Sequence, residues 1–335
     1  MLAEWLGVDA KDISGREPQP QAADAVVEVD KYVFVMEIKS SGAGAAVSEA
    51  AKRVRDYAAS VSKRAIPIVV VPYMGEVGRR LCEEAGVQWL DLSGNVHIIA
   101  PGVRILIEGK PNRFKPRGRP SSAFAPKASR IARWLLIHPD TFLSQRDIAV
   151  ATDMDEGYTS RVVGRLKEEN LVVRDDEGAI RARDPSLLLD AWREAYDFEK
   201  HRILRGHVAA RSGDALLRAT AESLSELNAD HAASGLGAAW LMTRFAGFRL
   251  VTFYLREQPS PALLDGLSFR EEERGANVWL VVPNDEGVFH GSSEREGIRC
   301  VHPVQVYLDL AAHPERASDA VNELRERYVS WRRSA

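Results

Sequence analysis

Residues 23–39 read ADAVVEVDKYVFVMEIK and decide the fold of the N-terminal part of this chain. The stretch is rich in Val, Tyr and Phe, which favour β-strands, and Asp30 and Lys31 interrupt it in the middle. We therefore expect two antiparallel strands joined by a two-residue turn. With that turn the numbers of paired residues sum to 61, so Asp24 lies directly across from Glu37.

A third charged side chain belongs to the same face of this hairpin. Lys39 follows Glu37 by two residues, which is the side-chain period of a strand. Directly opposed carboxylates destabilise paired strands unless a cation lies between them. Mg²⁺ prefers such oxygen ligands, and a nearby Lys can activate water while the metal polarises a phosphodiester. Asp24, Glu37 and Lys39 are therefore candidate catalytic residues, with the two carboxylates as candidate metal ligands.

The segments that follow the hairpin alternate between helix and strand patterns. We expect a helix over residues 45–61, an apolar strand over 66–72, and a helix over 75–86 that closes at Gly86. Further strands complete residues 1–110. This order predicts an α/β domain with a mixed sheet, within a multidomain α/β protein.

The hairpin resembles the restriction-endonuclease-like family, whose motif is an Asp followed on the next strand by Glu-x-Lys, here Asp24 and residues 37–39. The resemblance covers residues 1–110 and implies an Mg²⁺-dependent DNA nuclease. Related domains often carry a Gln four residues before a Tyr; this chain has Tyr57, preceded by Arg53 at the Gln position. The alternatives are an inherited fold whose chemistry is lost, or a half-exposed hairpin with scattered charges.

A basic linker follows this domain. Residues 109–139 contain eight Lys or Arg and no Asp or Glu, although the chain has a formal net charge of −3. Four prolines within residues 111–128 exclude a helix or a central strand there. The sequence KPRGRP in this linker resembles the AT-hook, whose Arg-Gly-Arg core enters the minor groove of A·T-rich DNA. The alternative is a solvated tether whose positive charges give only non-specific affinity for DNA.

Simple physics supports the AT-hook interpretation. Narrow minor grooves attract inserted Arg, Gly permits close backbone approach, and Pro keeps the chain extended. The candidate DNA-binding residues of the linker are Arg117, Gly118, Arg119 and Pro120.

Residues 129–185 show the layout of a winged helix-turn-helix. Three short helices are expected over residues 129–140, 144–153 and 155–170, and two short strands then flank an Asp-Glu-Gly turn. Ser144 is a suitable N-cap for the second helix. The third helix is the expected recognition helix, because helix-turn-helix proteins place its N-terminal residues against base edges.

The recognition helix supplies the remaining candidate contacts. The candidate base contacts are Tyr158, Thr159, Ser160 and Arg161. The candidate phosphate contacts are Arg165 and Lys167, and Arg181 lies at the edge of the wing with Arg174 and Arg183. Acidic side chains at residues 153, 155 and 156 leave a protein-binding winged helix as the alternative.

The last part of the chain predicts an amphipathic helical connection over residues 186–206 and an α/β domain over 207–335. Together with the winged helix it resembles the AbiEi-type antitoxins of type IV toxin-antitoxin systems, over residues 120–325. The segments that carry this resemblance most clearly are ASRIARWLL, GYTSRVVGRL, LLLDAWREAY and PVQVYLDL. The resemblance implies a repressor of its own operon that counters a toxin enzyme through the C-terminal domain.

Composition limits the remaining choices. The chain has 335 residues, a hydrophobic fraction of 45%, and only Cys82 and Cys300, so we expect two or three domains and no disulfide framework. No stretch is typical of a signal peptide or a membrane span, so we expect a soluble cytoplasmic protein. The expected partners are double-stranded DNA, a cognate toxin and a second copy of the chain. Three functions remain open: a regulator, a nuclease and an interaction scaffold.

Overall fold

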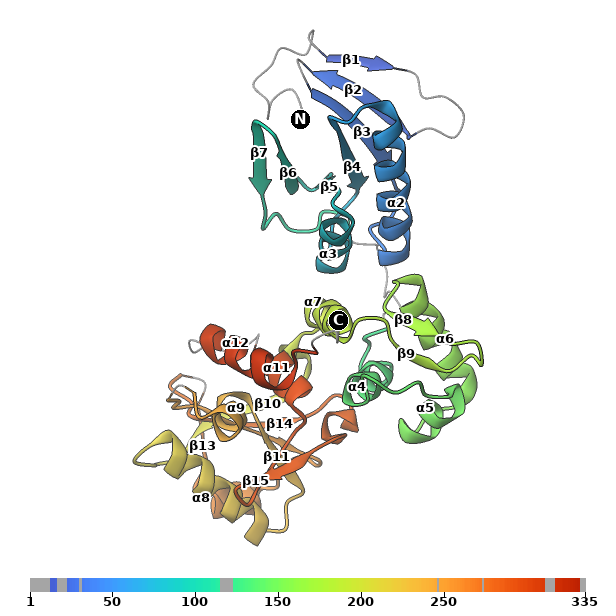
Figure 1. The fold of residues 1–335 in the computed structure, drawn as a ribbon. Coiled ribbons are helices and arrows are strands. Elements are labelled where there is room, and N and C mark those ends of the chain that lie inside the picture. The colour runs from blue at the N-terminus through green and yellow to red at the C-terminus, as the bar shows by residue number, and fades with distance from the viewer. Residues whose placement is uncertain are drawn as a thin grey trace. The chain divides into compact units, whose positions relative to one another are not determined.

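The computed structural model describes residues 13–16, 23–29, 32–114, 123–245, 247–272, 274–310 and 317–331. The chain forms two compact units, one from residues 1–121 with 163–173 and the other from residues 122–162 with 174–335. Each unit has its own seven-stranded sheet, and Figure 1 labels most of the elements of both.

The sheet of the first unit has its strands in chain order. Strands β3, β4 and β5 are parallel, and the strands on either side of this trio are antiparallel to their neighbours. Helices α2 and α3 connect the parallel strands and pack on each other, and α2 also packs on the sheet. The elements are β1 (Ile13–Arg16), β2 (Ala25–Val29), β3 (Tyr32–Ile38), α2 (Gly44–Val61), β4 (Ala65–Val71), α3 (Glu76–Ala85), β5 (Gln88–Asp91), β6 (Val96–Ala100) and β7 (Val103–Ile107).

The hairpin register agrees with the expected one. Ala25 pairs with Met36 and Val29 pairs with Tyr32, so paired numbers sum to 61. Asp30 and Lys31, the predicted turn residues, lie outside the described residues. Gly86 ends α3 with a left-handed φ of 67°, which glycine adopts without the steric cost of a side chain.

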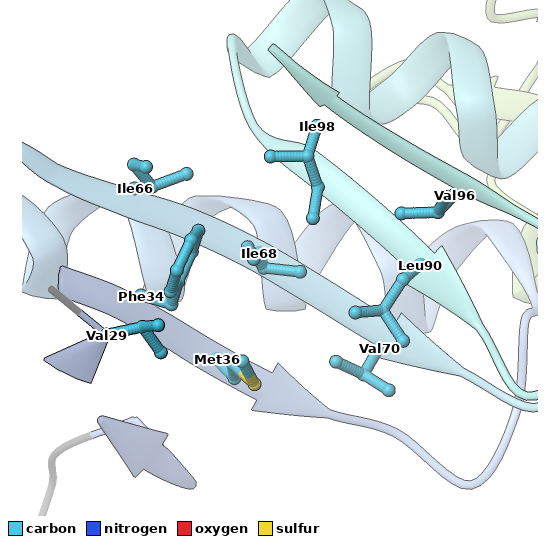
Figure 2. Close-up of a cluster of buried hydrophobic side chains, with 9 residues drawn as sticks. All are labelled: Val29, Phe34, Met36, Ile66, Ile68, Val70, Leu90, Val96 and Ile98. Carbon is cyan, nitrogen blue, oxygen red and sulfur yellow. The ribbon is translucent and has the colours of Figure 1, made fainter. Parts of the chain in front are cut away.

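One face of the sheet carries the apolar cluster drawn in Figure 2. Phe34 and Met36 of β3 belong to this cluster, and Ile68 of β4 lies beside them with no exposed surface. Because side chains alternate along a strand, Glu37 points to the opposite face, where α2 lies. The members of the cluster are Val29, Phe34, Met36, Ile66, Ile68, Val70, Leu90, Val96 and Ile98.

The predicted winged helix is present as a helical trio followed by a two-stranded wing. Its elements are α4 (Ser129–Ile137), α5 (Gln145–Ala151), α6 (Glu156–Glu168), β8 (Val172–Arg174) and β9 (Ile180–Ala182). The side chain of Ser144 caps α5 by accepting a hydrogen bond from the backbone N–H of Asp147, as the sequence predicts. Ile148 and Ala149 are buried on the inner face of α5.

The C-terminal region is built on a mixed sheet of strand order β13-β10-β14-β12-β11-β16-β15. Helix α4 of the winged helix packs on α7 and α11 of this region. The elements are α7 (Pro185–Ala195), η2 (Phe198–Lys200), β10 (Arg202–His207), α8 (Gly213–Glu226), β11 (His231–Ser234), α9 (Gly235–Thr243), β12 (Val251–Leu255), α10 (Pro261–Gly266), β13 (Arg270–Glu271), β14 (Val278–Val282), η3 (Glu286–Phe289), β15 (Ser293–Arg295), β16 (Ile298–Cys300), α11 (Pro303–Leu310) and α12 (Ala317–Tyr328).

The expectation of a helical connection over residues 186–206 is wrong in its second half. Helix α7 ends at Ala195, and residues from Arg202 onward form strand β10, which is antiparallel to β14. The apolar residues of this segment fit a helix and a strand equally well, and pairing with a strand about 80 residues later decides the outcome. Among the described residues, no helix is both long and apolar enough to cross a membrane.

Candidate nucleic-acid interface and the Glu37 cluster

The two carboxylates of the hairpin have separate partners. The established register, extended by one residue, places Asp24 across from Glu37. The exposed Asp24 accepts a hydrogen bond from the backbone N–H of Ile38 through Oδ2 at 2.7 Å. Glu37 is fully buried under α2. The register therefore brings these residues to neighbouring positions, but their oxygens are used differently.

Two cations of the chain hold the buried Glu37 carboxylate. Lys39 Nζ lies 3.0 Å from Glu37 Oε1, and Arg53 Nη1 of helix α2 lies 3.2 Å from the same oxygen. Burial of an unpaired carboxylate is costly, so this pairing explains how Glu37 tolerates full burial. Arg53 occupies the position at which the restriction-endonuclease-like resemblance would place Gln. We call this group of Glu37, Lys39 and Arg53 the Glu37 cluster.

The two cations of the Glu37 cluster occupy one of the two carboxylate oxygens. The guanidinium of Arg53 and the ammonium of Lys39 both lie against Glu37 Oε1, where they would compete with a bound Mg²⁺ for that oxygen. The described residues hold no group of three or more His, Cys, Asp or Glu side chains that could bind a metal ion. Lys39 lies beside Glu37, as the strand period predicts, and acts there as a counter-ion.

Helix α6 exposes part of the predicted base-reading set. Ser160 and Arg161 are exposed, and Tyr158 is half-buried with the Arg161 guanidinium 5.6 Å from its ring centroid. Thr159 is fully buried, and its hydroxyl donates a hydrogen bond to the backbone O of Asp155 at 3.0 Å. The expectation that Thr159 reads bases is therefore wrong, because this side chain belongs to the packed face of the helix.

Acidic side chains lie at the N-terminus of α6. Asp155 Oδ1 accepts a hydrogen bond from the backbone N–H of Tyr158 at 2.7 Å, and Glu156 lies in the first turn. These carboxylates occupy the end of the helix that would otherwise attract a phosphate. Cationic residues lie further along, with Lys167 exposed and Arg165 half-buried in the last turn. DNA contacts are thus expected along the side of α6 and not at its tip.

The wing holds its arginines in defined positions. The exposed Arg174 donates from Nη1 to the backbone O of Gly178 at 2.7 Å, across the turn of the wing. The half-buried Arg181 lies over the ring of Phe142, with 4.6 Å between the guanidinium carbon and the ring centroid. Stacking of this kind restricts the side chain and leaves its charge near the surface.

The basic stretch over residues 109–139 ends in two buried arginines. Arg117, Gly118, Arg119 and Pro120 lie outside the described residues. Arg130 and Arg133, the last two cations of the basic stretch, are 7% and 2% exposed, so they do not belong to a DNA-facing surface. Arg133 stacks on Trp192 at 4.9 Å, and burial lowers the pKa of its guanidinium.

The C-terminal region contains a buried polar network that the sequence analysis did not predict. Asp309 of α11 accepts hydrogen bonds from Ser234 at 2.5 Å, Tyr196 at 2.5 Å, Gln305 at 2.6 Å and Tyr254 at 3.0 Å. Burial raises the pKa of Asp309 to about 6, although these four donors act in the opposite direction. The sequence feature that could have indicated this network is the pair Gln305 and Asp309, which lie four residues apart in the largely apolar helix PVQVYLDL.

Comparison with known families assigns the second half of the chain. Residues 181–330 match a family described as transcriptional regulator, AbiEi antitoxin, type IV TA system. Residues 181–330 are thus similar to AbiEi antitoxins, and we call them the antitoxin region. Residues 124–182 match the MarR family, in agreement with the winged helix. The adjacent matches together make this part of the chain a DNA-binding regulator of antitoxin type. No curated protein and no solved structure matches the chain.

Proposed function

We propose that this AbiEi-type protein represses its own operon by binding double-stranded DNA through α6 and the wing. The observation that carries the proposal is the exposed pair Ser160 and Arg161 on the recognition helix of a winged helix joined to an antitoxin region. Direct base contacts from α6 give specificity, while Arg165, Lys167 and Arg181 contact phosphates or flank the wing. The C-terminal region antagonises a cognate toxin.

The test is a gel shift with DNA from upstream of the chain's own gene. Arg161→Ala should weaken binding by at least about fivefold, because a base contact contributes roughly 1–3 kcal/mol. Arg270→Ala is the matched control, since Arg270 is an exposed arginine on strand β13 of the C-terminal sheet. Equal binding by wild type, Arg161→Ala and Arg165→Ala would remove the role given to α6.

The basic linker and a second copy of the chain complete the proposal. Residues 117–120 insert into the minor groove beside the winged-helix site, as the likeness of KPRGRP to the AT-hook implies. Two chains bind a two-fold operator, because helix-turn-helix proteins commonly match palindromic half-sites. Light scattering of the protein with and without operator DNA measures this stoichiometry; one chain per operator would contradict the dimer.

A second candidate function is DNA cleavage by the N-terminal domain, for which we propose a restriction-endonuclease-like fold. Its support is the order of strands and helices and the placement of Asp24 across from Glu37. The pairing of Glu37 with Arg53 favours a domain that grips DNA without cutting it.

One incubation separates the two functions. Supercoiled plasmid carrying the upstream region is mixed with wild type or Glu37→Ala in Mg²⁺, Mn²⁺ or EDTA. A retarded but uncut band in all three buffers supports a regulator. Nicking that needs metal and disappears in Glu37→Ala would establish a nuclease.

A further inference from the structure

Arg130 of helix α4 makes a buried clamp between the winged helix and the antitoxin region. Its Nε and Nη2 donate to the two carboxylate oxygens of Asp285, each at 2.8 Å. Both side chains are largely buried, at 8% and 11% exposure. A bidentate Arg–carboxylate pair fixes orientation as well as distance, and burial protects it from solvent screening.

The third nitrogen of Arg130 contacts the turn in front of the recognition helix. Nη1 donates to the backbone O of Thr152 at 3.2 Å. Thr152 is the fully buried C-cap of α5, and Asp153 after it has a left-handed φ of 53°. Asp153 also places its carboxylate 3.9 Å from the same nitrogen. Arg130 therefore holds the chain where it turns from α5 into α6.

The other end of the clamp is an ordered turn of the antitoxin region. Asp285 Oδ1 also accepts the backbone N–H of Gly287 at 2.8 Å and caps η3. A Cβ atom at Gly287 would lie 2.7 Å from Cγ of Arg130, so only glycine leaves room for this arginine. The MarR match contains Arg130 and Thr152, whereas the AbiEi match contains Asp285.

We propose that Arg130 is a positioning residue for DNA recognition, through which the antitoxin region sets the orientation of α6. The proposal rests on the proposed function, because it concerns how the same winged helix reads its operator. A change at Asp285 reaches the turn before α6 through one side chain, because Arg130 donates hydrogen bonds to Asp285 on one side and to the backbone O of Thr152 on the other. Specific binding depends on the position of α6, whereas non-specific binding depends mainly on the number of phosphate contacts.

The ion pairs beyond the clamp provide a matched control. Glu286 Oε1 lies 3.5 Å from Arg130 Nη2, and its Oε2 lies 3.1 Å from Arg256, which in turn pairs with Asp230. Arg256 and Asp230 are 41% and 42% exposed, so their pairing contributes little. Arg256→Ala removes an arginine of the same region and leaves the Arg130–Asp285 pair intact.

The experiment compares affinity for the operator with affinity for unrelated DNA, for wild type, Arg130→Lys, Asp285→Asn and Arg256→Ala of the full chain. Arg130→Lys keeps the charge and loses the planar fork. We expect it to weaken operator binding by at least about fivefold, the value of one misplaced base contact, and to change non-specific binding less than twofold. Asp285→Asn should do the same, and Arg256→Ala should match wild type.

Circular dichroism and thermal unfolding separate positioning from loss of fold. Each variant is assayed at a temperature where its spectrum equals that of wild type. Operator affinity equal to wild type in folded Arg130→Lys and Asp285→Asn would overturn the inference. So would a parallel loss of specific and non-specific binding. Absence of operator preference in wild type itself would instead contradict the proposed function.

Discussion

Arg53 Nη1 lies 3.2 Å from Oε1 of the fully buried Glu37. A guanidinium on α2 thus neutralises the carboxylate that the hairpin motif nominates as a metal ligand. Lys39 adds a second positive charge at 3.0 Å. The first unit therefore balances this buried charge with its own side chains.

Removing Arg53 should destabilise the first unit. Arg53→Met leaves Glu37 buried with Lys39 alone, and we expect a loss of about 1–2 kcal/mol in the free energy of unfolding, because the arginine is partly exposed. Glu37→Gln/Arg53→Met should recover part of this loss, since it removes the uncompensated charge. Urea titration measures both values. Arg55→Met, at an exposed arginine of the same helix that pairs with Asp56, is the control. Arg53→Met as stable as wild type would refute the charge-balancing role.

Thr159 and Ser160 should separate stability from recognition. Thr159→Val keeps the side-chain shape and loses the hydrogen bond to Asp155, so we expect about 1 kcal/mol lower stability and unchanged operator affinity. Ser160→Ala should preserve stability and weaken operator binding by roughly fivefold, because Ser160 is exposed on α6. Fluorescence anisotropy and thermal unfolding give the two readouts. The reverse pattern would mean that α6 presents a different face to DNA.

Arg165 and Lys167 should set the salt dependence of binding. Each neutralised phosphate adds close to one unit to the slope of log affinity against log salt, so Arg165→Ala and Lys167→Ala should each lower it by about 1. Both should weaken operator and unrelated DNA alike. Lys200→Ala, an exposed lysine of η2, should leave the slope unchanged. A slope equal to wild type in both variants would exclude phosphate contacts at these positions.

The basic linker should read the sequence beside the operator. Arg117→Ala/Arg119→Ala should lose affinity for operators with A·T-rich flanks and change little with G·C-rich flanks, because the narrow A·T minor groove attracts arginine. Affinity for the two operators is measured at one salt concentration. An equal loss on both would show that the linker only tethers the chain electrostatically.

Two histidines of the C-terminal region should make the fold acid-sensitive. Burial lowers the pKa of His201 and of His302 to about 4. Between pH 6.5 and 4 the unfolded chain therefore binds protons that the folded chain does not, so the free energy of unfolding decreases as the pH is lowered. Asp309 opposes this trend, because its pKa of about 6 lets the folded protein keep a proton that the unfolded carboxyl loses. Unfolding temperature should fall on acidification.

Two variants check these signs. His302→Gln should flatten the dependence of unfolding temperature on pH between 6.5 and 4, because it removes one group that protonates only on unfolding. Asp309→Asn should steepen it, because the opposing carboxyl is gone. An unaltered pH profile in both would show that other groups control acid unfolding.

Local signals in the sequence predicted much of the secondary structure. The hairpin register followed from a two-residue turn and the alternation of side chains, and the cap at Ser144 and the end of α3 at Gly86 depended only on neighbouring backbone. The winged helix was predictable for the same reason, since its helices are short, amphipathic and close together in the chain.

Long-range contacts decided what the charged residues do. Arg130 belonged to a basic stretch in the sequence, yet it is buried against Asp285, 155 residues later. Arg53 became the counter-ion of Glu37 only when α2 packed over β3, and residues 202–207 became a strand only by pairing with β14. The sequence determines the charge of a side chain, whereas packing determines which group pairs with it. Pairing depends on which distant groups are buried beside the charge, where the low dielectric strengthens their interaction.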